Sequence, residues 1–146
     1  MADPVEAAIK NALLQPLIGF CSSPAIPLAL PNIDFSQPTP ARGALWLRAT
    51  ILPADSFAPS IGFDSTIQHF GLMQVDIFYS ENSGEIAPAR IAGSLAMLYR
   101  RGTDLFDSGF KVNIYRAPTV RRAIKDEPWL MLPVVVPYQC FAPTPA

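Results

Sequence analysis

The sequence has few of the side chains that metal centres use. Its 146 residues include one histidine, His69, and two cysteines, Cys21 and Cys140. A structural zinc site needs four such ligands close together, so we expect no metal site of this kind. Two cysteines leave a Cys21–Cys140 disulfide open, but we favour buried free thiols in a reducing compartment.

Catalytic and phosphate-binding motifs are also missing. The sequence contains no G-x-S-x-G, no G-x-G-x-x-G and no G-x-x-x-x-G-K, so neither a nucleophile elbow nor a phosphate-cradling loop is indicated. His69 has no partner motif, and acids such as Asp104 and Asp107 flank a turn, where local hydrogen bonding is their usual role. We therefore expect no enzyme and no cofactor.

Charge is scarce, at 16% of residues, and residues 11–33 carry none. This uncharged stretch does not predict a membrane helix, because Pro16, Pro24, Pro27 and Pro31 interrupt it. The acidic start of the chain also fits a signal peptide poorly. We expect a soluble, intracellular protein.

The charges that do occur are unevenly distributed. Residues 90–125 hold eight of the 11 basic side chains and two acids, a balance of +6, which leaves −7 for the remainder. Such asymmetry suits either nucleic-acid binding or head-to-tail contact between copies of one protein. The net charge of −1 favours contact between copies. Trp46, Arg48 and Thr50 alternate along one predicted strand and could form a platform for nucleic-acid bases. We favour the simpler interpretation, that they form the outer face of the sheet.

Hydrophobic periodicity predicts six elements. Helices are expected at 4–15, ended by Pro16, and at about 86–101; strands are expected at 45–51, 71–80, 110–116 and 129–143. This order predicts a single domain, 1–146, of the α+β class. Its two layers would be a four-stranded, mainly antiparallel sheet and two helices packed on one face.

The last strand carries two prolines inside an apolar run, "WLMLPVVVPYQCFAP". Pro133 and Pro137 remove backbone donors from the same edge, because N–H groups alternate between the two edges of a strand. We therefore predict a strand that pairs fully on one side and presents a limited edge to the outside.

Two segments are candidate assembly interfaces. A long loop, about 53–68, carries Phe57, Ile61 and Phe63, an unusual apolar content for a solvated loop. The second segment precedes the last strand and carries four basic residues: Arg116, Arg121, Arg122 and Lys125. A solvated charge run is its ordinary interpretation, but the nearby strand keeps an interface role open.

Several short sequence segments, in their order along the chain, resemble a phage protein family whose structural relatives are the tail terminator proteins of long-tailed bacteriophages. The pieces span about residues 4–142 and are "PNIDF", "LWLRATILPAD", "GLMQVDIFYSENSG", "GTDLFDSGFKVNI" and "PWLMLPVVVPYQCFAP". Each piece is loose by itself, and their order and spacing carry the resemblance.

The resemblance implies a virion protein of the tail, assembled in the bacterial host cytoplasm. It implies a ring of copies, usually a hexamer, that caps the tail tube, stops its polymerisation and meets the head. The implied partners are other copies, the major tail tube protein and the head–tail connector, with no membrane and with DNA only passing through the ring. A head-completion or minor tail protein of similar fold is the alternative, followed by a nucleic-acid-binding module that uses residues 116–125.

Overall fold

A computed structural model describes residues 4–22, 25–41, 43–54 and 66–143. Two helices and eight strands make up this part of the chain. In order they are α1 (Val5–Ser22), β1 (Leu28–Ala29), β2 (Leu45–Pro53), β3 (Thr66–Ser80), α2 (Ile86–Leu98), β4 (Asp104–Asp107), β5 (Phe110–Asn113), β6 (Thr119–Val120), β7 (Ile124–Asp126) and β8 (Trp129–Pro143).

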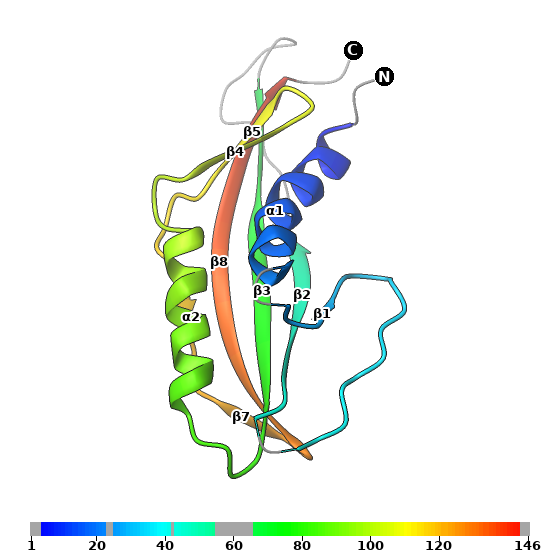
Figure 1. The fold of residues 1–146 in the computed structure, drawn as a ribbon. Coiled ribbons are helices and arrows are strands. Elements are labelled where there is room, and N and C mark those ends of the chain that lie inside the picture. The colour runs from blue at the N-terminus through cyan, green and yellow to red at the C-terminus, as the bar shows by residue number, and fades with distance from the viewer. Residues whose placement is uncertain (1–3, 23–24, 42, 55–65, 144–146) are drawn as a thin grey trace.

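The strands form one eight-stranded mixed sheet in the order β1-β2-β3-β8-β5-β4, and β6 and β7 also pair with β8. The β1–β2 pair is parallel and the other pairs are antiparallel. The sheet curls into a half-barrel, and Figure 1 shows the bow of β8 along its length.

The prediction of a four-stranded sheet is therefore wrong, although the α+β class holds. β1, β4, β6 and β7 were not predicted because each is only two to four residues long. β5 is equally short; it was predicted as the longer strand 110–116 and ends at Asn113. Segments of two to four residues carry little readable alternation. They form because the long neighbouring strands β2 and β8 and the β5 hairpin offer them backbone partners.

Both helices pack on the concave face of the sheet. α1 contributes Ile9, Leu13 and Leu17 to the main core, and α2 contributes Ala92 and Leu95. The sheet meets them with alternate strand residues: Leu47, Ala49, Met73, Val75, Ile77, Val112, Val134, Val136, Tyr138 and Cys140. The alternation read from the sequence for β2 and β3 thus placed these strand faces correctly.

α1 continues past Pro16, so the predicted helix end at that residue is wrong. Proline removes one intrahelical hydrogen bond and normally ends or kinks a helix. Here the apolar stripe continues at four-residue spacing, and Leu13, Leu17 and Cys21 are all buried in the core. Burial of this last turn offsets the lost bond.

β8 is a central strand, so its predicted role as an edge strand is wrong. Along one edge it pairs with β3 without interruption, from Ser80↔Trp129 to Thr66↔Pro143. Along the other edge β7, β6 and β5 pair with it in turn. Pro133 lies between the β7 and β6 pairings and Pro137 between those of β6 and β5. The missing donors therefore coincide with breaks between short strands inside the subunit.

Candidate assembly surfaces

The predicted basic segment lies along the interrupted edge of β8. Arg116, Arg121, Arg122 and Lys125 are all exposed. The Arg116 guanidinium lies 5.5 Å from the centre of the Tyr115 ring. The backbone N–H of Arg121 donates to the Pro133 carbonyl at 2.8 Å, which fixes the segment to β8. The other predicted interface residues, Phe57, Ile61 and Phe63, lie outside the described residues.

At one end of the molecule, a basic residue of the +6 region lies close to acidic residues of the −7 region. Lys125 Nζ lies 3.2 Å from Glu127 Oε1 and 3.8 Å from Glu81 Oε1. Glu85 and Arg122 both line a groove beside α2. At this end the +6 and −7 regions therefore intermingle and do not form two faces of opposite sign.

An aromatic cluster occupies one end of the convex sheet face. Trp46 stacks on Phe78 with ring centres 4.0 Å apart and lies edge-on to Trp129 at 6.2 Å. Phe35, from the segment between β1 and β2, stacks on Trp46 at 5.1 Å. Trp46 is only 3% exposed, so it offers no free ring for a base to stack on.

Next to this cluster lies a buried carboxylate, Asp76, whose two oxygens both accept hydrogen bonds. Asp76 is 1% exposed, and its Oδ2 accepts bonds from Arg48 Nη2 at 3.0 Å and Nε at 3.2 Å. Its Oδ1 accepts a bond from Gln74 Nε2 at 2.7 Å. The Arg48 guanidinium also lies 4.9 Å from the Phe78 ring centre. Arg48 is thus committed within the subunit, and the outer-face interpretation of Trp46, Arg48 and Thr50 fits this geometry.

Further along the convex face, apolar side chains are exposed in register. Leu52 pairs with Leu72, which in turn pairs with Pro137 on β8. Both leucines are exposed, and so is Phe141 two rows further on. These residues occupy positions that would be polar on a sheet face in water.

α2 is incompletely buried for so apolar a helix. Its 13 residues include one charged side chain, Arg90. Only Pro88, Ala92 and Leu95 are buried, while Ile86 is 67% and Met97 is 65% exposed.

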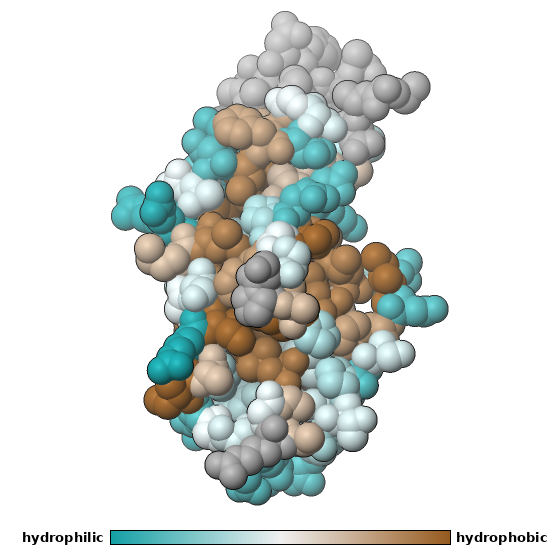
Figure 2. Space-filling view, viewed as in Figure 1, coloured by the Kyte–Doolittle hydropathy of each residue, from teal (hydrophilic) through white to brown (hydrophobic). Residues whose placement is uncertain are grey.

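Two grooves border α2. One, of about 610 Å³, lies between α2 and the β6–β7 segment and is lined by residues that include Ala89 and Val120. The other, of about 490 Å³, lies between α2, the end of α1 and the residues that follow it, and Phe20, Ile26 and Ile91 line it. Figure 2 shows a band of hydrophobic surface across the middle of this face. Sequence reasoning missed α2 as a surface, although its near absence of charge was a readable signal.

His69 lies on β3, and both cysteines belong to the main core. His69 lines a small hollow of about 160 Å³ with Glu6, Lys10 and Tyr138. In the described part of the chain no group of three or more His, Cys, Asp or Glu side chains lies together as a metal site would need. None of the described helices is long and apolar enough to cross a membrane.

Both cysteines are free and buried, as we favoured from the sequence. Burial raises the pKa of the Cys21 thiol to about 11 and also raises the pKa of Cys140. Neither thiol is therefore a reactive nucleophile in the folded subunit.

Comparisons with known proteins agree with this fold. A family model described as "Phage tail terminator protein" matches residues 5–138. A solved structure that carries no functional description superposes with a TM-score of 0.74 at 22% identity, over 90% of this chain and 92% of that one. A chain from the "Virion of native gene transfer agent (GTA) particle" superposes with a TM-score of 0.55 at 15% identity, over 96% and 98% of the two chains. No curated protein matches in the sequence search.

Proposed function

Because this chain belongs to the phage tail terminator family, we propose that copies of it form a ring on the last ring of the tail tube. The ring ends growth of the tube and offers its other side to the head–tail connector. Six copies is the number that the family resemblance implies. The single observation that carries this proposal is the family match over residues 5–138.

The exposed apolar surface of the subunit supports an assembled state. Ile86 and Met97 on α2, and Leu52, Leu72 and Phe141 on the sheet, are large and exposed. Gathered apolar side chains on a surface usually mark a contact with another protein. Two separate apolar surfaces on one subunit suit a component that meets neighbours on more than one side.

A ring also needs two different, complementary surfaces on each subunit, because head-to-tail contacts close only when unlike faces meet. The exposed apolar residues Ile86 and Met97 lie on α2, whereas Leu52, Leu72 and Phe141 lie on the sheet, so the subunit presents apolar side chains from more than one element. The prolines of β8 do not supply the stop to tube growth that an impaired outer edge suggested, because that edge is covered by β5, β6 and β7. We propose instead that tube growth ends because the outer side of the assembled ring differs from the end of the tube and cannot bind another tube ring.

Deletion of the gene in its phage tests the proposal. A terminator predicts over-long or irregular tails, measured as a length distribution by electron microscopy, and normal lengths when the wild-type gene is supplied from a plasmid. Tails of normal length detached from filled heads would instead identify a head-completion protein. Normal, joined virions would contradict both roles.

A further inference from the structure

The outward surface of α2 lacks the composition of a helix that stays in water. Ile86, Arg90 and Met97 lie at spacings of four and seven residues, on one ridge of the helix, and all three are exposed. The small residues Ala89, Gly93 and Ser94 flank the ridge and line the two grooves beside it. A helix that is apolar almost all round is normally covered, so this ridge is a candidate contact surface for a partner.

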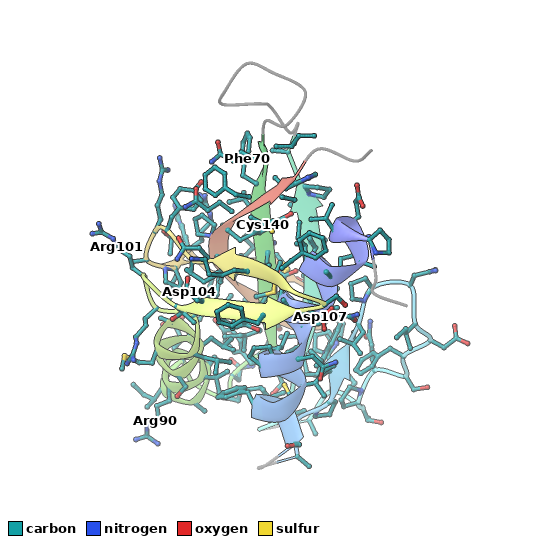
Figure 3. All side chains as sticks on the ribbon, turned by 90° about the horizontal axis from the view of Figure 1, so that it is seen from above. Phe70, Arg90, Arg101, Asp104, Asp107 and Cys140 are labelled. Atoms are coloured by element: carbon teal, nitrogen blue, oxygen red, sulfur yellow. The ribbon has the colours of Figure 1, made fainter. Side chains whose placement is uncertain are left out.

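The charge of this surface specifies part of the partner's chemistry. No acid occurs from residue 86 to 101, whereas Arg90, Arg100 and Arg101 are exposed. Among the described residues none of the three arginines makes an ion pair. Figure 3 shows Arg90 and Arg101 extending outward from the same side of the molecule. The exposed Glu85 directly precedes α2 and lines the groove beside the ridge, so the surface is positive in net charge and not free of acid. The complementary surface should therefore be apolar and carry net negative charge.

The segment 30–41, between β1 and β2, has this composition. It is named the connector below and is distinct from the head–tail connector of the phage. Its only charged residue is Asp34, which is exposed, and Ile33 beside it is 60% exposed. Both follow a tight turn in which the Ile33 N–H donates to the Leu30 carbonyl at 3.3 Å and Asn32 has a φ of 55°. Phe35 then stacks on Trp46. The turn and the stack hold Ile33 and Asp34 in one presentation before any contact forms.

The connector and α2 lie on opposite sides of the subunit. In Figure 1 α2 lies at the left and the connector projects at the right, and the view from above in Figure 3 agrees. The convex sheet face fits the arginines less well, because Asp76 there is buried and already paired with Arg48. Two different, complementary surfaces on one chain build a ring of identical subunits when the rotation between neighbours closes.

We propose that the connector of one subunit docks on the α2 ridge of a second copy of this chain, with Ile33 against the apolar ridge and Asp34 beside its arginines. This inference rests on the proposed ring and names its subunit interface. In a ring built from this contact, each subunit binds one neighbour through its connector and the other neighbour through its α2 ridge.

Cysteine-specific cross-linking tests the contact. In the variant Ile33→Cys/Met97→Cys, a short bismaleimide should produce a ladder of covalent oligomers on a denaturing gel. Each single variant should remain a monomer, because unlike surfaces meet. The wild-type protein is the blank, since Cys21 and Cys140 are buried and free. Light scattering on the same samples records whether oligomers are present.

Three outcomes would overturn the proposal. Oligomers by light scattering without a ladder would reject this interface and leave the ring in place. A dimer from Met97→Cys alone would show that α2 meets α2. A protein that stays monomeric at every concentration and gives no ladder would reject both the interface and the self-assembly of the isolated chain. The terminator role would then be tested separately by the tail lengths of the deletion phage.

Charge reversal gives an independent readout. Arg90→Glu should weaken association by about tenfold or more, because it places a carboxylate against Asp34. Lys111→Glu, an equal charge change at an exposed residue of β5, is the matched control and should change association less than twofold. Adding Asp34→Arg to Arg90→Glu should restore part of the loss. If Arg90→Glu and Lys111→Glu weakened association equally, the effect would come from the net charge of the protein and not from a specific contact, which would contradict the proposal.

Discussion

At the scale of single residues, the convex sheet face is organised by a few close contacts. Asp76 is buried and accepts bonds from Arg48 and Gln74. A buried charge is tolerated only with such partners. Gly71 shows the same dependence on close geometry, since it lies opposite Tyr138 in the sheet.

Replacing Asp76 tests the polar contacts. Asp76→Ala should lower the free energy of unfolding by about 2–3 kcal/mol, because it removes the acceptor of a charged hydrogen bond and opens a small void. Asp76→Asn keeps the shape and an acceptor oxygen and should cost less. Urea unfolding measures both, and an Ala variant as stable as the wild type would show that the pair contributes nothing.

Gly71→Ala tests the close approach of two strands. A Cβ at this position would lie 2.5 Å from the Leu52 carbonyl oxygen, 2.8 Å from the Tyr138 hydroxyl and 2.9 Å from Pro53 Cα. Overpacking of this kind costs about 1–3 kcal/mol. The control is Gly19→Ala in α1, where nothing lies within 4 Å and a gain of about 0.5–1 kcal/mol is expected. Thermal or urea unfolding would reject the argument if the two changes had the same sign.

The buried thiol of Cys21 predicts a dependence of stability on alkaline pH. Its folded pKa is raised by burial from 9.0 to about 11, so the unfolded chain releases this proton first. The stability is fully present below pH 9 and is lost as the pH rises from about 9 to 11. Buried tyrosines act in the same direction, so the comparison is with Cys21→Ala, whose unfolding free energy should fall less steeply across that range. Parallel curves would show that Cys21 does not contribute.

At the scale of elements, sequence patterns located both helices and the strands β2, β3, β5 and β8, but they missed β1, β4, β6 and β7. β3 begins at Thr66, inside the loop predicted at about 53–68 and five residues before its predicted start. β8 begins and ends at the predicted residues, and α2 begins at the predicted residue. α1 extends beyond its prediction because tertiary burial of Leu17 and Cys21 outweighs the local effect of Pro16. β6 and β7 exist only as backbone partners of β8, information that no local pattern contains. Their presence is also why the prolines of β8 misled the edge prediction.

Pro16 yields a prediction for α1. Pro16→Ala restores an N–H inside a helix that already passes through this position. It should raise the free energy of unfolding by about 1–3 kcal/mol, since an interior proline costs about 3 kcal/mol. Gln15→Ala, at an exposed neighbouring residue, should change it by less than about 0.5 kcal/mol. Circular dichroism during urea unfolding measures both, and a destabilised Pro16→Ala would show that the helix is built around its proline.

At the scale of the whole molecule, the candidate surfaces were only partly readable from the sequence. The basic residues Arg121 and Arg122 were identified and are exposed, but their part in assembly stays a prediction. The α2 ridge was not predicted. Its near absence of charge was readable in the sequence, but which of its residues are exposed depends on how the helix packs on the sheet. The charge asymmetry of the sequence is reduced in space, since Lys125 lies beside Glu81 and Glu127.

Arg121→Glu/Arg122→Glu tests the basic segment as an assembly surface. Both side chains are exposed, so the fold should remain intact and its urea midpoint nearly unchanged. Association of subunits or attachment to tail tubes, followed by light scattering and co-sedimentation, should weaken. Unchanged assembly would remove the two arginines from the interface and leave α2 as the candidate.

The most direct measurement for the central claim is an averaged electron-microscopy reconstruction of the head-proximal end of the phage tail. We predict a closed ring of this chain in the terminal position, with the connector of each copy on α2 of its neighbour. A tail end that lacks this chain, or that holds it as isolated copies, would contradict the account.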